Sequence, residues 1–302
     1  MVMSMKNFKL KMEDGLYIHG LILEPEKNIK GVIQIAHGMC EHKERYIPFM
    51  KYLKDHGYVC VIHDHRGHGQ SINDDNELGY FGNNKDILTD ELYKVTKYIK
   101  KKYKEKDIIL FGHSMGSLVT RRYIANHDRE ISKLILCGAP TYNPLSKLAI
   151  ILASVINFIQ GPRKRSKLLN DLSVGNYNKN FNVSNEWLSY NKRNVLNYNS
   201  DELCGFTFTN NGFKMLFKML DLVYREEEYI MNNKKMPIFV IGGEDDPVIG
   251  DKDKFKHLVY FLEDLGYKKV KSKLYKNMRH EILNEKDRKI VYKDILDFVN
   301  KN

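Results

Sequence analysis

Short apolar runs alternate with longer amphipathic segments along most of the chain. Several of these runs are apolar at nearly every position, which is typical of strands buried on both faces of a parallel sheet. They predict strands at 16–23, 31–36, 58–63, 107–111, 133–138, 236–242 and 269–275. Apolar positions spaced three or four apart predict helices at 45–56, 85–105, 115–127, 251–266 and 285–300. This alternation predicts an α/β fold, with a mostly parallel sheet flanked by helices.

The alternation stops between 141 and 230, where Asn, Tyr, Lys and Phe become frequent. We interpret 141–230 as a helical cap inserted into a core formed by 1–140 and 231–302. Open α/β sheets bind ligands at the carboxyl ends of their strands, so we expect the cap to cover that edge. The apolar stretch 145–159 would rise only about 22 Å as a helix, too short to span a bilayer. It either packs in a core or rests on a membrane, with the basic cluster 163–167 beside it.

Composition narrows the class of protein. The chain has 302 residues, of which 42% are hydrophobic and 29% charged, so it is neither mostly disordered nor fibrous. The net charge of +11 favours anionic surfaces without specificity, and because no nucleic-acid-binding motif accompanies it we expect no nucleic-acid partner. Four cysteines without a CxxC pair indicate reduced thiols. Since the first residues hold no apolar run of signal-peptide length, we predict a cytoplasmic protein with peripheral membrane contact through the cap.

A candidate nucleophile follows the strand predicted at 107–111. The residues Gly112-His113-Ser114-Met115-Gly116 form a G-x-S-x-G motif between that strand and a predicted helix. In this context the motif makes a sharp turn that exposes the serine hydroxyl at the edge of the sheet. The glycines are required because the strand and the helix approach each other closely there. The motif therefore predicts Ser114 as the nucleophile of an acyl-transfer reaction.

A serine nucleophile needs a base, and the base needs an acid to orient it. In this architecture the chain order is serine, acid, histidine. His257 lies within a predicted helix, whereas His280 lies in a loop between the last predicted strand and the last predicted helix, so we assign His280 as the base. The acid follows the strand at 236–242, where doubled glycines leave two registers, Asp245 and Asp246. Pro247 would fix the backbone after the second, which favours Asp246.

Two backbone N–H groups are expected to stabilise the oxyanion. One belongs to Met115, the residue after the nucleophile, and the other to Met39, because Gly38 lets the loop after 31–36 turn its amides inward. The histidines of 63–68 lack the spacing of a metal site, so we expect neither a metal nor a cofactor.

Five motifs in order resemble the α/β-hydrolase superfamily, and within it the monoglyceride lipase and lysophospholipase group. They are HGMCEHKERY at 37–46, DHRGHGQS at 64–71, GHSMG at 112–116, GEDDPV at 243–248 and RHE at 279–281. The resemblance implies an α/β-hydrolase fold with a Ser114, Asp246 and His280 triad and with Met39 and Met115 as oxyanion donors. It also implies that Glu41 and Arg45 lie near the polar end of the substrate pocket. Cys40 departs from the pattern, since a small residue, usually glycine, is expected there.

These motifs predict a serine hydrolase that cleaves carboxylic esters of lipids with one acyl chain through an acyl-enzyme. An aminopeptidase or amidase, and a short-chain carboxylesterase, are alternatives on the same fold. A peptidase would need an acidic anchor for an N-terminal amine, and the cap is more basic than acidic near its apolar segment. A non-catalytic binding module is a further alternative, which the complete triad disfavours. The motifs carry no information on oligomeric state.

Overall fold

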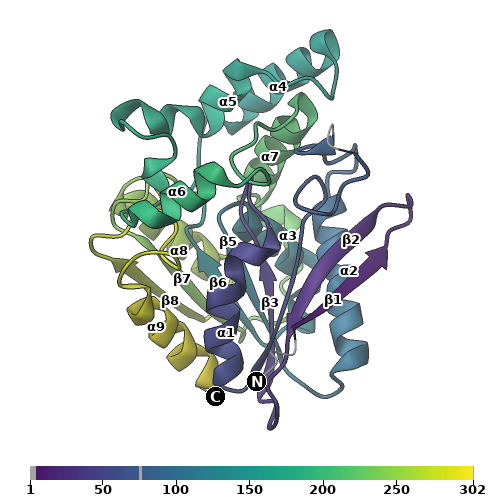
Figure 1. Cartoon of the computed structure of the whole chain (residues 1–302), viewed down its shortest axis with the longest axis vertical. Coiled ribbons are helices and arrows are strands. Elements are labelled where there is room, and N and C mark those ends of the chain that lie inside the picture. Colours follow the sequence, from purple (N-terminus) through teal and green to yellow (C-terminus); the bar gives the residue numbers. More distant parts are fainter. Residues whose placement is uncertain (1–4, 75–76, 302) are drawn as a thin grey trace.

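A computed structural model describes residues 5–74 and 77–301, which are organised around one eight-stranded sheet (Figure 1). The spatial order is β1-β2-β4-β3-β5-β6-β7-β8. β1 and β2 are antiparallel to their neighbours, and the remaining strands are parallel, as the sequence predicted. The strands are β1 Met5–Lys11, β2 Tyr17–Leu23, β3 Gly31–Ala36, β4 Tyr58–His63, β5 Ile108–His113, β6 Lys133–Cys137, β7 Pro237–Gly243 and β8 Lys269–Tyr275.

The middle of the sheet is buried on both faces. Every residue of β3, β4 and β5 is buried, which explains why these segments are apolar at almost every position. Ala36 at the end of β3 lies opposite His63 on β4 and Gly112 on β5. The loops that follow these strands therefore leave the sheet at the same edge, which is where the sequence places its motifs.

Helices cover both faces of the sheet. α1 (Ile47–Asp55) and α9 (Arg288–Asn300) pack into the hydrophobic cluster on one face. α2 (Ile87–Lys102), α3 (Met115–His127) and α8 (Lys252–Asp264) pack into the larger cluster on the other. The start of β1 and the end of α9 lie at the edge of the sheet opposite the motif-bearing loops (Figure 1).

Four α-helices lie between β6 and β7 and sit above the carboxyl edge of the sheet (Figure 1). They are α4 (Ser146–Gln160), α5 (Lys167–Ser173), α6 (Lys192–Ser200) and α7 (Asn210–Leu222). α4 packs along α7, which rests on α3 of the core. We call this layer the cap; the domain boundaries at 141 and 230 stay a prediction. Within the described residues, none of the helices combines the length and apolar character needed to cross a bilayer.

The sequence pattern did not predict β1. This strand carries Lys6, Lys9 and Lys11 and is exposed at most positions, because it forms the outer edge of the sheet. The alternation of partly buried Phe8 and Leu10 with exposed Lys9 and Lys11 covers only the second half of the strand, so pairing with β2 defines it more clearly than its own sequence does.

Candidate active site

Ser114 occupies a strained turn between β5 and α3. Its φ of 51° and ψ of −120° are rarely adopted by residues other than glycine, and its N–H donates to the Cys137 carbonyl at 2.9 Å. A Cβ atom at Gly116 would lie 2.1 Å from the carbonyl oxygen of Ala36, so a glycine is needed for α3 to approach β3. This packing holds the Ser114 side chain at the edge of the sheet, half-buried and facing the cap.

His280 and Asp246 form a buried pair. The Nδ1 atom of His280 lies 2.9 Å from Oδ2 of Asp246, and the second carboxylate oxygen accepts the Val248 N–H at 2.8 Å. Asp245 is exposed and accepts a hydrogen bond from the Tyr190 hydroxyl at 3.2 Å. Of the two registers left open by the sequence, the geometry brings Asp246 to His280 and directs Asp245 away from it.

Ser114 and His280 line a cavity of about 540 Å³ between the core and the cap. Met39 and Met115, the predicted oxyanion donors, line its floor beside the nucleophile. The cap lines the cavity with polar residues such as Asn170 and Asn178 and with apolar side chains that include Leu145, Ala149, Leu172, Leu216, Phe217 and Leu220. A polar reaction centre therefore opens into a space whose cap side suits a hydrocarbon chain.

Glu41 fixes the loop that carries Met39. Its Oε1 atom accepts the Gly38 N–H at 2.6 Å and the Tyr46 hydroxyl at 2.8 Å, and its Oε2 atom accepts from Arg45 at 2.7 Å. Burial opposes ionisation of Glu41, but hydrogen bonding to His113 and the charge of Arg45 outweigh it and hold the pKa well below its usual range. Glu41 lines the cavity, yet its carboxylate oxygens are engaged by other groups of the protein.

Arg45 does not itself line this cavity, but it is ion-paired with Glu41 and Glu281, which do. Its guanidinium binds both carboxylate oxygens of Glu281, at 2.6 and 2.7 Å, and donates to Asn194 of α6 at 3.2 Å. Burial opposes ionisation of Glu281, but Arg45 outweighs it and lowers the pKa of that carboxyl. Arg45 thus links the oxyanion loop, the residue after His280 and the cap, which favours a positioning role.

His113 is a site residue that the sequence reasoning passed over. Its ring centroid lies 4.8 Å from that of His280, and its Nδ1 atom lies 3.0 Å from the Tyr46 hydroxyl and 3.3 Å from Oε1 of Glu41. Burial disfavours the charged imidazole, but Glu41 outweighs burial and raises the pKa of His113. The variable position directly before the serine in G-x-S-x-G was the available signal, because it must lie beside Ser114.

Cys40 occupies a backbone conformation that explains why glycine is expected there. Its φ is 53°, in the left-handed region, and its side chain is buried. The thiol lies 2.8 Å from the Phe206 carbonyl, and the Cys40 carbonyl accepts from the Tyr198 hydroxyl at 2.9 Å and the Gly205 N–H at 3.0 Å. Burial raises the pKa of the thiol well above its usual value. Cys40 therefore packs against the cap as an un-ionised thiol.

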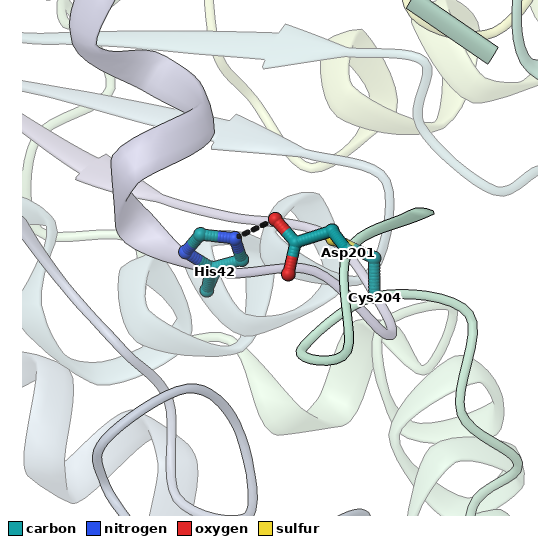
Figure 2. Close-up of side chains that lie close together, drawn as sticks. All are labelled: His42, Asp201 and Cys204. Carbon is teal, nitrogen blue, oxygen red and sulfur yellow. Dashed lines mark hydrogen bonds and ion pairs between the residues drawn. The ribbon is translucent and has the colours of Figure 1, made fainter. Parts of the chain in front are cut away.

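His63, His65 and His68 are buried in a cluster of rings, and their ring nitrogens do not converge on one point. A different group of possible ligands gathers elsewhere in the described residues: His42, Asp201 and Cys204 (Figure 2). The Nδ1 atom of His42 lies 2.6 Å from Glu44, and Nε2 lies 2.9 Å from Asp201. Burial disfavours the charged ring, but hydrogen bonds to Cys204, Glu44 and Asp201 raise the pKa of His42 to about 11.

Comparison with known proteins places this geometry in context. The profile of the family described as serine aminopeptidase, S33, matches residues 27–287. Monoglyceride lipase of Rattus norvegicus is 28% identical over 247 residues, which cover 80% of this chain and 74% of that protein. Probable lysophospholipase L2 of Haemophilus influenzae is 23% identical over 296 residues, covering 92% of this chain and 87% of that protein. The crystal structure of a carboxyl esterase from Bacillus coagulans in complex with glycerol superposes with a TM-score of 0.90 at 25% identity, covering 99% of both chains.

Proposed function

This chain belongs to the serine aminopeptidase S33 family of α/β-hydrolases, and on that premise we propose that it hydrolyses carboxylic esters of lipids with one acyl chain. The observation that carries the proposal is the placement of Ser114 beside an apolar cavity while His280 is paired with a buried Asp246. The similarity to monoglyceride lipases and to a lysophospholipase supports this substrate class.

The reaction follows from the arrangement of the three side chains. The Ser114 oxygen attacks the ester carbonyl while His280 takes its proton, and the Met39 and Met115 N–H groups stabilise the negative oxygen. His280 then gives the proton to the departing alcohol, which leaves an acyl-enzyme. Water, deprotonated by His280, attacks the acyl carbon, and the same proton returns to the Ser114 oxygen as the fatty acid leaves.

The cavity favours a lipid over a peptide. An aminopeptidase would need a carboxylate free to bind an N-terminal amine. Glu41 and Glu281 are the acidic residues that line the cavity among the described residues, and both are ion-paired with Arg45. A buried carboxylate that already has a cationic partner is a poor anchor for a second cation. The apolar cap wall, by contrast, suits an acyl chain.

A labelling and substrate panel tests the proposal. Wild type should react with a fluorophosphonate probe at Ser114 and hydrolyse monoacylglycerol or lysophosphatidylcholine faster than p-nitrophenyl acetate or an aminoacyl p-nitroanilide. Ser114→Ala should lose labelling and lose about 10⁴-fold or more of kcat. Ser132→Ala, at the opposite end of the sheet, is the matched control. Preference for the anilide would favour the aminopeptidase alternative, and preference for the acetate would favour a short-chain esterase.

We further propose that α4 of the cap docks on lipid surfaces. One side of α4 packs on the cap and core through Ala153 and its neighbours, while the other exposes apolar side chains to solvent. Those exposed are Leu148, Ile151, Val155, Phe158 and Ile159, with Leu145 just before the helix. Exposed Arg163, Lys164 and Arg165 follow it, which adds attraction to anionic headgroups. This helix is neither a core segment nor an ordinary polar surface.

Flotation with anionic vesicles tests the docking role. Ile151→Ser/Phe158→Ser should reduce vesicle binding at low salt, because both side chains are exposed on α4. Ile290→Ser is the control, since Ile290 is an exposed isoleucine on α9, away from the cap. Equal binding of the double variant and wild type would overturn the docking role and leave the proposed hydrolase activity untouched.

A further inference from the structure

Three side chains of different chemistry meet where the cap joins the core. His42 ends the loop after β3, whereas Asp201 and Cys204 lie in the turn after α6 (Figure 2). One ligand atom from each lies within 4.8 Å of the other two, and Nε2 of His42 is 2.9 Å from Oδ2 of Asp201. His42 and Cys204 are buried, and Asp201 is partly exposed. The fold therefore gathers a nitrogen, an oxygen and a sulfur donor around one point.

We propose that His42, Asp201 and Cys204 form a binding site for Zn²⁺ that is separate from the catalytic centre. Imidazole, carboxylate and thiolate are ligands that zinc accepts, and three protein ligands leave a fourth position for water. Ligand atoms on one tetrahedral zinc lie roughly 3–4 Å apart, so these side chains need to shift by only about 1 Å. The partial exposure of Asp201 leaves a path for the ion.

Glu44 supplies the support that a ligating histidine requires. Its Oε2 atom lies 2.6 Å from Nδ1 of His42, which orients the ring so that Nε2 points at Asp201 and Cys204. A carboxylate behind the imidazole is the usual outer partner of a zinc ligand. Binding would displace the proton between His42 and Asp201 and the thiol proton of Cys204. The two positive charges of the ion replace those two protons, so the net charge of the cluster is unchanged.

The position of the site gives the ion a structural role. Gly205, next to Cys204, donates to the carbonyl of Cys40 in the oxyanion loop at 3.0 Å. An ion held by His42 of the core and by Asp201 and Cys204 of the cap would fasten the two layers beside the cavity. Since the ligands exclude Ser114, His280 and Asp246, the ion would take no part in the chemistry. Hydrolysis without zinc is therefore compatible with this site.

Metal binding by the full-length protein tests the site directly. Protein treated with EDTA and then freed of it is titrated with Zn²⁺ against a chromophoric chelator, and with Co²⁺ to follow the thiolate-to-cobalt absorption band. Wild type should bind one ion per chain, show that band and gain thermal stability on saturation with zinc. Cys204→Ser should lose the band and bind at least tenfold more weakly. Glu44→Gln should weaken binding by about tenfold, because it removes the support of His42.

His257→Gln is the matched control, because His257 is an exposed histidine on α8. It should bind zinc as wild type does. Absence of stoichiometric binding, or equal binding by wild type, Cys204→Ser and Glu44→Gln, would overturn the site. If Cys204→Ser does not fold, the cobalt band of wild type and its change in Glu44→Gln still decide. Ester hydrolysis by metal-free protein separates this test from that of the proposed function.

Discussion

The candidate functional side chains are largely buried in the core but exposed to solvent in the cap. In the core, Asp246 and His280 are 1% and 3% exposed, and hydrogen bonds fix Asp246, Glu41 and Glu281 on more than one side. In the cap, Phe158 and Ile159 are 90% and 75% exposed and project away from the protein. Buried, fully paired groups keep a reactive geometry, whereas exposed apolar groups are suited to meeting another apolar surface. The contrast supports the proposals that the core cleaves the ester bond and that the cap delivers the substrate.

Substitution of two neighbouring aspartates of the core should give very different losses of activity. Asp246→Asn should lower kcat by about 10⁴-fold, because an amide no longer holds the tautomer of His280 that accepts the serine proton. Asp245→Asn should stay within a few-fold of wild type, since Asp245 is exposed and bonds Tyr190. Single-turnover kinetics with one p-nitrophenyl ester measure both. The opposite ranking would move the acid to Asp245.

Acid should destabilise the core through its buried histidines. Burial lowers the pKa of His63 and His68 to about 4, and that of His37 and His65 falls well below 6.5. In the unfolded chain these histidines bind protons near their ordinary pKa, whereas in the folded chain they remain neutral at that pH. The contribution of these histidines to the free energy of unfolding is therefore complete above pH 6.5. It declines as the pH falls from 6.5 towards 4.

The size of that decline is several kcal/mol, because each of His63 and His68 contributes about 3 kcal/mol across the window. Glu91 opposes it, since burial raises the pKa of that carboxyl to about 7. Urea unfolding at several pH values measures the slope. His68→Phe should flatten it, because Phe binds no proton in either state and can keep the stacking on Phe81. An unchanged slope in His68→Phe would show that His68 does not contribute to the pH dependence of stability.

A positioning role for Arg45 predicts a smaller loss. Arg45→Lys keeps the charge but loses the paired hydrogen bonds to Glu281, so the loop that carries His280 should shift. We expect kcat to fall by about 10²-fold with KM nearly constant, as for a misplacement of about 1 Å. Steady-state kinetics on a soluble ester give both parameters. A rise in KM with kcat intact would instead indicate contact with substrate. Lys54→Met, on the surface of α1, is a suitable control.

Substitutions in the cap should reduce activity less than those in the core, and the loss should depend on the substrate. Ile151→Ser/Phe158→Ser should slow hydrolysis of long-chain monoacylglycerol in vesicles by roughly tenfold or more, since burying one such side chain contributes about 1.5–3 kcal/mol. Hydrolysis of p-nitrophenyl acetate should not change, because the substitutions lie outside the core. Parallel assays on the two substrates measure the difference. Equal losses on both would show that the cap affects the reaction centre itself.

The same contrast explains what could be predicted from the sequence. Ser114, Asp246 and His280 each follow a strand of the core, so a local pattern of residues is enough to place them at one edge of the sheet. The helices α5, α6 and α7 were not predicted individually. α5 and α6 are short, with seven and nine residues, whereas α7 has 13 residues and apolar side chains at helical spacing that offered an unused signal. Contacts such as His42 with Asp201, 159 residues apart, leave no local pattern at all. The partners of Arg45 in the structure, Asn194 and Glu281, are likewise distant in the chain, so these contacts could not be predicted from a local pattern.

The two outer strands of the sheet indicate a role for part of the net charge that does not involve a ligand. β1 carries Lys6, Lys9 and Lys11 along one margin of the sheet, and β8 carries Lys269, Lys271 and Lys273 along the other. Both margins offer unpaired backbone groups on which a second molecule could add a strand. Rows of lysine at both margins repel such an addition. Part of the +11 charge is therefore placed where it disfavours the addition of a second molecule to either margin of the sheet.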